Sequence, residues 1–327
     1  MVEKRSTILI TGAAGFIAGH LAHALDAQRS VNLILSDEFL SEAKRPNWSG
    51  LTDAICIPRE QLVDQLNAGS IRPDWVIHLG ARTDTTEFDY SIHEQLNLNY
   101  SKSVWDYCTR MQVPLIYASS AATYGNGEQG YSDDESKLEE LKPLNPYGLS
   151  KHQFDLWAKE QVNHPPHWYG LKFFNVYGFR EEHKGRMASM IYHGFHQIRE
   201  RGFVRLFKSH RPDYGDGEQR RDFIYIKDIV RVIQWLLSTA PESGIYNLGT
   251  GKARTFNDLI RAVFAAMDLS PNIEYIDMPE DLRNSYQYFT EASMGKLREA
   301  GYPSEFYSLE QGVTDYVRNY LLAEETE

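Results

Sequence analysis

The sequence contains very little cysteine, because only Cys56 and Cys108 occur among its 327 residues. Neither stands in a C-x-x-C spacing, so the pattern indicates neither a disulfide framework nor a zinc site. Both thiols are best interpreted as reduced side chains in or near the core. We therefore expect no structural metal.

Long apolar runs and an excess of basic residues are also missing. No stretch approaches the roughly 20 residues that span a bilayer, and the run at 8–10 is too short for a signal peptide. We therefore expect no membrane partner and a cytoplasmic location. Lys and Arg number 34 against 45 Asp and Glu, for a formal net charge of -11. Because an acidic chain repels phosphate backbones, nucleic acid is not expected as a partner, and an anionic ligand would need a local basic cluster.

Short apolar runs alternate with amphipathic segments through the first half of the chain. Strands are predicted over residues 7–10, 33–36, 75–79, 114–118 and 171–175, with helices over 16–27, over 92–111 and from near Tyr147. Strands that alternate with helices predict βαβ units, right-handed crossovers and a doubly wound parallel sheet.

The second half of the chain is less regular. Strands are predicted over 224–226 and 244–248, and helices follow the first of these through Leu237 and lie over 256–267 and 309–322. No linker separates the halves, so we expect two lobes between which the chain passes more than once. The larger comprises 1–175 with a return segment at about 222–250, and the smaller, of mixed α/β structure, comprises 176–221 and 251–327.

A glycine-bearing turn, Thr11-Gly-Ala-Ala-Gly-Phe-Ile-Ala18, joins the first predicted strand to the first predicted helix. Gly12 and Gly15 permit a tight turn, and the helix start offers free N–H groups and a positive dipole end to a pyrophosphate. The spacing differs from G-x-G-x-x-G, with Ala18 where a third glycine is more frequent. An ordinary strand–helix turn is the alternative, but the position favours a Rossmann-type dinucleotide-binding domain.

The residues after the second predicted strand leave the choice of dinucleotide open. Asp37 would accept hydrogen bonds from the ribose hydroxyls of NAD, and Glu38 favours NAD as well. The cations Lys44, Arg45 and Arg59 would suit the 2′-phosphate of NADP. The residues by themselves predict a nicotinamide dinucleotide without deciding between the two.

A serine run and a Tyr/Lys pair predict redox chemistry. Ser120 follows the strand predicted over 114–118, and Pro146 can occupy the first position of the next helix. Tyr147 and Lys151 then lie four residues apart on one face, where the ammonium should lower the pKa of the phenol and make Tyr147 an acid/base at neutral pH. Y-x-x-x-K alone is common, so the order of the three motifs is what carries the prediction.

Over essentially its whole length the sequence resembles the extended short-chain dehydrogenase/reductase family. The likeness is carried by Ala118-Ser-Ser-Ala-Ala-Thr-Tyr-Gly125, Phe173-Phe-Asn-Val-Tyr-Gly178, Arg180-Glu-Glu-His-Lys-Gly-Arg-Met-Ala-Ser189, Arg221-Asp-Phe-Ile-Tyr225, Tyr246-Asn-Leu-Gly-Thr-Gly251 and Tyr286-Gln-Tyr-Phe-Thr290. Within that family, the His-Lys-Gly-x-Met-Ala-Ser run resembles epimerases of an ADP-linked heptose. The resemblance implies epimerisation of a nucleotide-linked sugar by transient oxidation and re-reduction with a bound nicotinamide cofactor.

The resemblance also implies roles for individual residues. Tyr147 and Lys184 form the acid/base pair, Ser120 lies beside the reacting oxygen, and Lys151 contacts the nicotinamide ribose. Lys44 and Arg59 match positions that meet the cofactor phosphate, which favours NADP, with NAD as the alternative. The other implied cofactor contacts are Gly12, Gly15, Phe16, Ile17, Asp37, Leu79, Ala81, Asn99 and Val176. The implied substrate contacts, mostly in the smaller lobe, are Asn175, Arg186, His193, Phe207, Arg221 and Tyr286. We further expect a homo-oligomer.

Four residues depart from the family pattern around the expected substrate. Lys172 and Ser285 stand where arginine is usual, Phe179 replaces a proline, and Arg186 replaces a small residue. The loop over 209–220 is longer than usual. These departures leave the redox motifs intact and the identity of the sugar and base open.

Three other functions agree less well with the sequence than epimerisation does. Ala121 and Ala122 stand where 4,6-dehydratases carry Asp-Glu and cannot move a proton, which argues against dehydration. A UDP-sugar 4-epimerase, which needs only the Ser, Tyr and Lys, is the alternative, although Lys184 argues against it. A non-catalytic dinucleotide-binding regulator would typically lack Tyr147 or Lys151, and both are present.

Overall fold

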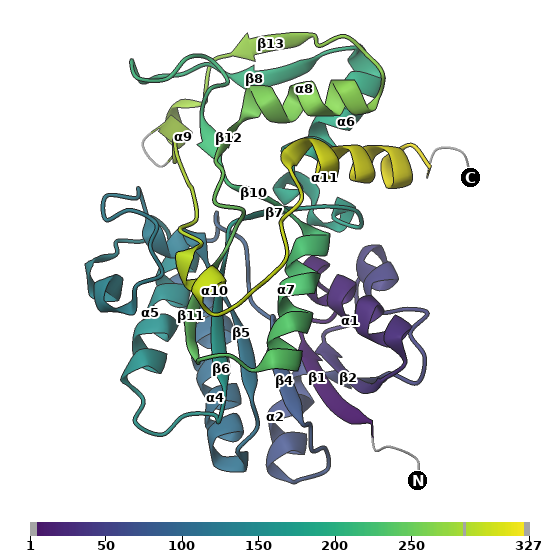
Figure 1. Ribbon diagram of the computed structural model, residues 1–327, viewed down its shortest axis with the longest axis vertical. Helices are drawn as coiled ribbons and strands as arrows, with labels where there is room; N and C mark the ends of the chain where they lie inside the picture. The colour runs from purple at the N-terminus through teal and green to yellow at the C-terminus, as the bar shows by residue number, and fades with distance from the viewer. Residues whose placement is uncertain (1–4, 284–285, 324–327) are drawn as a thin grey trace.

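The computed structural model describes residues 5–283 and 286–323, around a seven-stranded parallel sheet of order β11-β6-β5-β4-β1-β2-β3 (Figure 1). The strands are β1 (Ser6–Thr11), β2 (Val31–Asp37), β3 (Ile55–Pro58), β4 (Trp75–His78), β5 (Leu115–Ser120), β6 (Trp168–Phe173) and β11 (Gly244–Leu248). The order runs outward from β1 in both directions, so the chain reverses its winding between β1 and β4, where such folds bind ligands. The predicted Rossmann-type, doubly wound fold is confirmed.

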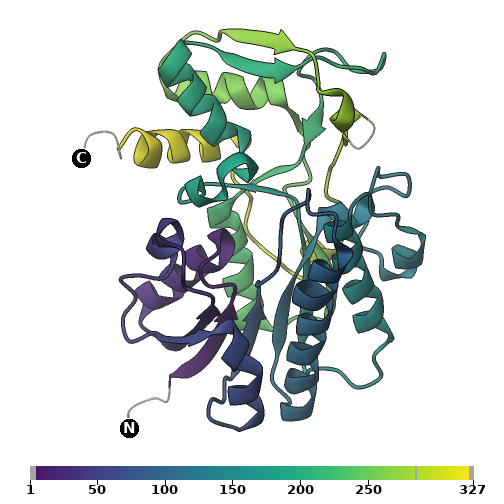
Figure 2. The same ribbon diagram turned by 180° about the vertical axis from the view of Figure 1, so that it is seen from behind.

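Helices cover both faces of the sheet. Helices α1 (Phe16–Gln28) and α7 (Ile226–Thr239) pack on one face, and α2 (Arg59–Asn67), α4 (Tyr100–Met111) and α5 (Pro146–Glu160) on the other (Figure 2). Along β1, Ile8 and Ile10 belong to the core cluster under α1 and α7, and Leu9 to the opposite one. Because both faces are buried, this strand has the continuous apolar sequence typical of parallel sheets.

A smaller lobe lies beyond the carboxyl ends of the strands, at the top of Figure 1. Its main elements are α6 (Met190–Arg201), β8 (Val204–Phe207), α8 (Phe256–Ala266), β13 (Ile273–Ile276), α11 (Leu309–Tyr316) and the π-helical η6 (Val317–Leu321). β8 pairs in parallel with β13, and α8 packs against α6 and α11. The expected mixed α/β lobe is therefore present.

Short elements connect these parts. Two-stranded ladders join β7 (Asn175–Tyr177) to β10 (Phe223–Tyr225) and β9 (Arg220–Arg221) to β12 (Arg254–Thr255). The short helical segments are η1 (Glu42–Asn47), α3 (Tyr90–His93), η2 (Glu94–Asn99), η3 (Ala121–Tyr124), η4 (Glu135–Glu140), η5 (Glu182–Met187), α9 (Glu280–Arg283) and α10 (Gly295–Glu299).

The structure differs from the predicted elements in several places. The strand expected over 171–175 is divided, because the Phe174 N–H bonds to Leu248 and the Asn175 N–H bonds to Asp222, so that pairing passes from β11 to β10. No element was expected at β3, α2, α6, β8 or β13. β3 is an edge strand in which Ile55 is exposed, so its sequence lacks a buried-strand pattern.

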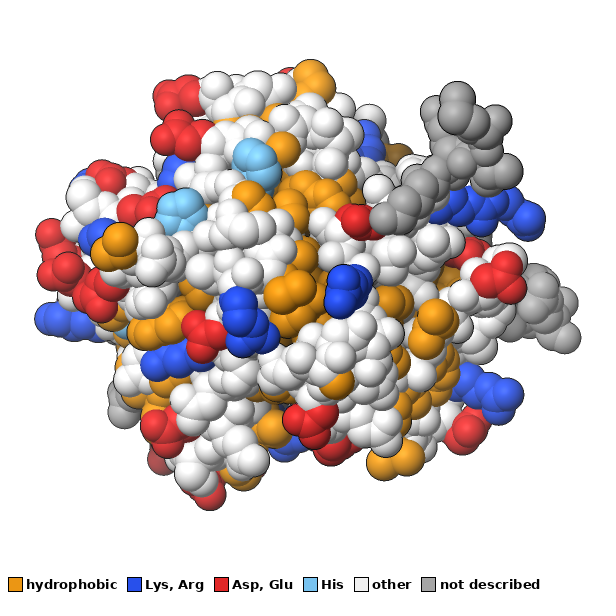
Figure 3. Space-filling model, turned by 90° about the horizontal axis from the view of Figure 1, so that it is seen from below, with side chains coloured by type: hydrophobic (Ala, Val, Ile, Leu, Met, Phe, Trp, Pro, Cys, Tyr) orange, Lys and Arg blue, Asp and Glu red, His pale blue; other side chains and the backbone are white. Residues whose placement is uncertain are grey.

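Within the described parts of the chain, no helix combines the length and apolar character needed to cross a bilayer. The same residues contain no group of three or more His, Cys, Asp or Glu side chains arranged to hold a metal ion. Seen from below, hydrophobic side chains are interspersed with acidic and basic ones (Figure 3).

Candidate active site

Glycines allow the turn after β1 to approach neighbouring backbone closely. Gly12 has φ +69°, and a Cβ there would lie 2.6 Å from the backbone of Gly80, in the turn after β4. A Cβ on Gly15 would lie 2.9 Å from the Gly12 carbonyl oxygen. The tight helix contact comes from Gly19, whose added Cβ would be 2.6 Å from the Asn47 Cβ. The alanine at position 18 therefore leaves this close packing intact.

The start of α1 is suited to an anion. The helix has 13 residues, no side-chain cap and no acidic residue in its first turn. Within the described chain, the first-turn N–H groups at Phe16 and Ile17 therefore have no side-chain acceptor. Aligned peptide dipoles place partial positive charge there. The turn fits the pyrophosphate of a dinucleotide.

The end of β2 carries charges of both signs. Asp37 faces the glycine turn, where its Oδ2 accepts from the Ala14 N–H at 3.0 Å. Arg59 donates to Glu38 Oε1 at 2.7 Å, so its charge is already partly neutralised. Lys44, in η1, has no ion-pair partner within the described residues. Lys44 is thus the cation left free for an added phosphate.

Leu79 and Ala81 flank Gly80 in the turn beside Gly12. Asn99, the third residue expected here, is exposed at the end of η2. Asn97, two residues earlier, is buried, accepts from the Arg82 N–H at 2.7 Å and approaches Ser150 Oγ at 3.0 Å. η2 is π-helical, which shifts the helical spacing and turns Asn97 toward α5.

Ser120 and Tyr147 meet where β5 ends and α5 begins. Ser120 is the last residue of β5, and Tyr147 follows Pro146 in the first turn of α5. Burial raises the pKa of the Tyr147 phenol above its ordinary value, and a hydrogen bond with Ser120 opposes part of that rise. The expected neighbours are therefore brought together.

Lys151 does not act on Tyr147 as expected. Its Nζ donates to the Ala118 carbonyl oxygen at 2.9 Å, and burial lowers the pKa of this lysine to about 8, while the Asp155 carboxylate raises it. The prediction that Lys151 lowers the pKa of Tyr147 is wrong for this structure, because burial of the phenol dominates and the ammonium is bound to β5.

Lys184 lies next to the start of α1. Its Nζ is 3.2 Å from Oε2 of Glu181 and 4.8 Å from the centre of the Phe16 ring. Glu181 is fully buried and also accepts from the N–H and Oγ of Ser189, at 2.8 and 2.6 Å. Nothing in the sequence pattern singled out Glu181 as the partner of Lys184.

Arg186 and the residues of β7 face different surroundings. The Arg186 side chain is 68% exposed, lies 3.5 Å from Asp84 Oδ1 and donates to Thr86 Oγ1, so it binds the segment after β4. Asn175 is exposed and Val176 half-buried on β7, which pairs with β10.

Arg221 is a buried cation among aromatic rings. Its guanidinium lies 5.2 Å from the centre of the Tyr286 ring and donates to the carbonyl oxygens of Arg220 and Gln287. Burial lowers the pKa of Arg221, and no carboxylate among the described residues pairs with it. The Phe207 ring is 6.3 Å from that of Tyr286. A buried cation without a counter-charge favours binding of an anion.

The remaining expected residues lie apart from Arg221 or outside the described chain. His193 is half-buried on α6, with its ring 5.8 Å from that of Tyr192. Phe179 stacks on Tyr320 at 3.7 Å and contacts His20 at 4.3 Å. Lys172 is buried and paired with Asp155. Ser285 lies outside the described residues.

The fold and the Ser120–Tyr147 site are those of a nicotinamide-dependent class of enzymes. The chain belongs to the NAD dependent epimerase/dehydratase family, whose sequence profile matches residues 8–249. The resemblance noted in the sequence is therefore confirmed.

Relatives of known name are similar over nearly the full chain. An ADP-L-glycero-D-manno-heptose-6-epimerase from Fusobacterium nucleatum is 46% identical over 98% of this chain and 99% of its own length. One of the same name from Nitratidesulfovibrio vulgaris is 47% identical over 96% and 98%. The crystal structure of the Helicobacter pylori ADP-L-glycero-D-manno-heptose-6-epimerase superposes with a TM-score of 0.80 at 27% identity, covering 96% of each chain.

Proposed function

We propose that this protein is an isomerase that converts ADP-D-glycero-D-manno-heptose into ADP-L-glycero-D-manno-heptose. The observation that carries the proposal is the near-full-length identity, 46 and 47%, to relatives that bear this enzyme's name. The position of Lys184 beside the start of α1 supports it, because a second proton-transfer group distinguishes this reaction from that of a single-tyrosine epimerase.

In this proposal the two lobes bind different ligands. Residues 1–175 and about 222–250 hold the dinucleotide, and residues 176–221 and 251–327 hold the nucleotide-sugar. The uncapped start of α1 and the turns at Gly12 and Gly80 support the first part. The buried cation Arg221, in the second lobe, supports the second.

We assign NADP as the cofactor, with NAD as the alternative. Lys44 has no ion-pair partner within the described chain and would meet the 2′-phosphate. Arg59 would have to exchange Glu38 for the phosphate. Phe16, Ile17, Leu79, Ala81 and Val176 would line the cofactor. We assign the asparagine contact to Asn97 in place of Asn99, because Asn97 is buried against the turn after β4.

During the reaction the sugar oxygen would occupy two positions, one before and one after the carbonyl turns over, and each position needs a group that transfers a proton. A nicotinamide cofactor, held by the turn at Gly12 and Gly15 and by Lys151, would supply reversible hydride transfer at the carbon to be inverted. Tyr147 would serve the oxygen in one orientation and Lys184 in the other. One of them would take the hydroxyl proton during oxidation, and the other would donate a proton to the oxygen during re-reduction, after the flat carbonyl has turned over. Ser120, already hydrogen-bonded to Tyr147, would hold the oxygen in place. Lys151 would contact the nicotinamide ribose.

Binding of the nucleotide-sugar is assigned mainly to the second lobe. Arg221 would pair with the pyrophosphate, where hydrogen bonds between charged groups are strong. Tyr286 lies beside Arg221, Phe207 lies beside Tyr286, and both would contact the nucleotide. Asn175, Arg186 and His193 complete the proposed set, with Arg186 leaving Asp84 when substrate binds.

The test is turnover by the cofactor-loaded enzyme in heavy water. ADP-D-glycero-D-manno-heptose, UDP-glucose and UDP-N-acetylglucosamine are supplied separately, and products are identified by NMR. We expect the enzyme to invert the ADP-heptose and neither UDP-sugar, with no deuterium at the inverted carbon. Turnover of the UDP-sugars alone would identify a 4-epimerase, and deuterium at the inverted carbon would exclude hydride return. A homo-oligomer and a cytoplasmic location stay predictions, and light scattering tests the first.

A further inference from the structure

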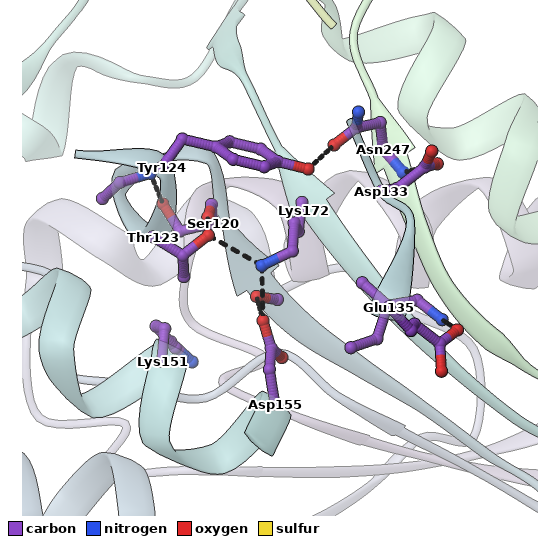
Figure 4. A network of polar contacts seen from close by, with 12 residues as sticks. Ser120, Thr123, Tyr124, Asp133, Glu135, Lys151, Asp155, Lys172 and Asn247 are labelled. Carbon is purple, nitrogen blue, oxygen red and sulfur yellow. Dashed lines mark hydrogen bonds and ion pairs between the residues drawn. The ribbon is translucent and has the colours of Figure 1, made fainter. Parts of the chain in front are cut away.

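A buried ion pair, between Lys172 and Asp155, lies close to Ser120 (Figure 4). Lys172 Nζ of β6 is 2.6 Å from Asp155 Oδ2 of α5, and both side chains are 0% exposed. Burying two charges is costly unless their remaining hydrogen bonds are satisfied. The other partners of each member therefore indicate what the pair does.

The Asp155 carboxylate binds the strand that ends in Ser120. It accepts from the Tyr117 hydroxyl at 3.1 Å and from Ser119 Oγ at 2.6 Å, and both donors belong to β5. Asp155 also follows Lys151 by four residues, about one turn of α5. This carboxylate therefore fixes the strand of Ser120 to the catalytic helix.

Lys172 holds the other side of Ser120. Its Nζ donates to Thr123 Oγ1 at 2.7 Å, and that hydroxyl donates to the Ser120 carbonyl oxygen at 2.8 Å. Figure 4 shows Thr123 and Asp155 converging on the Lys172 ammonium. The residues on both sides of Ser120 are thus bound to one ion pair.

We propose that Asp155 and Lys172 are positioning residues, which together set the place of Ser120 relative to Tyr147. The proposal rests on the proposed function, in which Ser120 and Tyr147 act on the sugar oxygen. A pair that served only to stabilise the core would be replaceable by apolar side chains. Here Asp155 binds Ser119, the residue before Ser120, and Lys172 binds Thr123, which in turn binds the Ser120 carbonyl oxygen.

The same carboxylate supports Lys151. Burial lowers the pKa of Lys151, and the charge of Asp155 raises it, which favours the ammonium. Burial lowers the pKa of His78, of β4, and the nearby Lys151 ammonium lowers it further. Lys172 stands where the family usually has arginine, and either cation supplies a donor to Asp155. Lys172→Arg is therefore the conservative variant that should keep the function.

The experiment compares the starting enzyme, Asp155→Asn, Lys172→Met, the double variant and Lys172→Arg, each loaded with NADP. Tm, kcat and KM for the ADP-heptose are measured. Crystal structures record the separation of Ser120 Oγ and the Tyr147 hydroxyl, which needs no substrate. Each single variant leaves a buried charge unpaired and should lose both Tm and kcat.

The double variant decides between positioning and stability. It should regain most of the lost Tm, while kcat stays lower by on the order of tenfold to a hundredfold at unchanged KM, the scale of small misplacements in an active site. Lys172→Arg should keep kcat. Recovery of kcat together with Tm, or a Ser120–Tyr147 separation equal to that of the starting enzyme, would overturn the proposal. If the starting enzyme turns over no nucleotide-sugar, the proposed function fails, and the crystal structures still decide the positioning role.

A matched control comes from another buried carboxylate. Asp228 of α7 is fully buried, pairs with Arg231 and accepts from the Tyr307 N–H at 3.0 Å. Asp228→Asn should lower Tm as Asp155→Asn does and leave kcat unchanged. An equal loss of kcat in both variants would show that any buried charge defect impairs turnover, and would likewise overturn the proposal.

Discussion

Lys184 Nζ lies 3.2 Å from Oε2 of Glu181, a side chain with no exposed surface. Two further hydrogen bonds from Ser189 hold this carboxylate, so the lysine is attached to a fixed point. The orientation of the proposed second proton-transfer group is therefore set by a residue that lies three positions earlier in the chain.

Replacing this carboxylate should affect turnover as well as stability. Glu181→Gln weakens the hydrogen bonds to Lys184 and Ser189, at a cost on the order of 1–3 kcal/mol for a buried polar group. We expect a Tm lower by several degrees and a lower kcat, measured by calorimetry and steady-state kinetics. The exposed neighbour Glu182, changed to Gln, should alter neither. Full activity of Glu181→Gln would mean that Lys184 needs no anchor.

The two proton-transfer groups should each be essential. Tyr147→Phe and Lys184→Met should lose on the order of a hundredfold or more in kcat, the usual scale for removing an acid/base group. Both variants should still bind NADP, which calorimetry checks. Near-normal turnover by Lys184→Met would show that Lys184 transfers no proton and would place the chain among the single-tyrosine epimerases.

Charges at the end of β2 should decide cofactor preference. Lys44→Ala should weaken NADP binding by on the order of tenfold, about 1.4 kcal/mol, and leave NAD binding unchanged. Glu38→Gln should strengthen NADP binding, because it removes one of the two carboxylates paired with Arg59. Titration calorimetry with both dinucleotides measures these changes. A preference for NAD that Lys44→Ala does not alter would remove the phosphate-binding assignment.

The buried guanidinium of Arg221 should act on substrate alone. Arg221→Ala should raise KM by at least tenfold, since charge-assisted hydrogen bonds to a buried phosphate are worth about 1.5–3 kcal/mol. The Kd for NADP should not change. The exposed neighbour Arg220 provides the control, and Arg220→Ala should leave KM unaltered. Equal KM values for Arg221→Ala and the starting enzyme would show that the pyrophosphate binds elsewhere.

Lys151 should make stability depend on pH in a known direction. Its pKa is lowered from 10.5 to about 8 in the folded, cofactor-free protein. Between these values the unfolded chain binds more protons than the folded one, so stability rises with pH. The starting protein should therefore gain Tm relative to Lys151→Met as pH rises from about 8 to about 10. A difference that stays flat over this range would contradict the lowered pKa.

Turns and helix starts could be predicted from the sequence where a few neighbouring residues determine them. The turn at Gly12 and the helix start at Tyr147 depend on neighbouring residues, and both lie as expected. The π-helical turn that contains Asn97 and Asn99 was not predictable, because it cannot be recognised from a 3.6-residue spacing.

Contacts between distant segments were not predictable in this way. The side-chain partners of Lys172 come from η3 and α5, and no spacing in the sequence links them. Glu181 and Lys184 are neighbours in sequence, but their pairing depends on the burial of Glu181. The resemblance to a family supplied Lys184 itself, and it supplied nothing about what holds that residue.

The ring of Phe179 lies flat on that of Tyr320, with 3.7 Å between their centres and 4° between their planes, and it also contacts His20. His20 belongs to the first helix of the large lobe, and Tyr320 to the last helix of the small one. The Phe179 ring therefore links a helix near the beginning of the chain to one near its end. Together with the ion pair between Lys227 and Asp315, at 2.5 Å, this stack ties α1 and α7 of the large lobe to the last helices of the small one, so a defect at Phe179 would loosen the contact between the two ends of the chain.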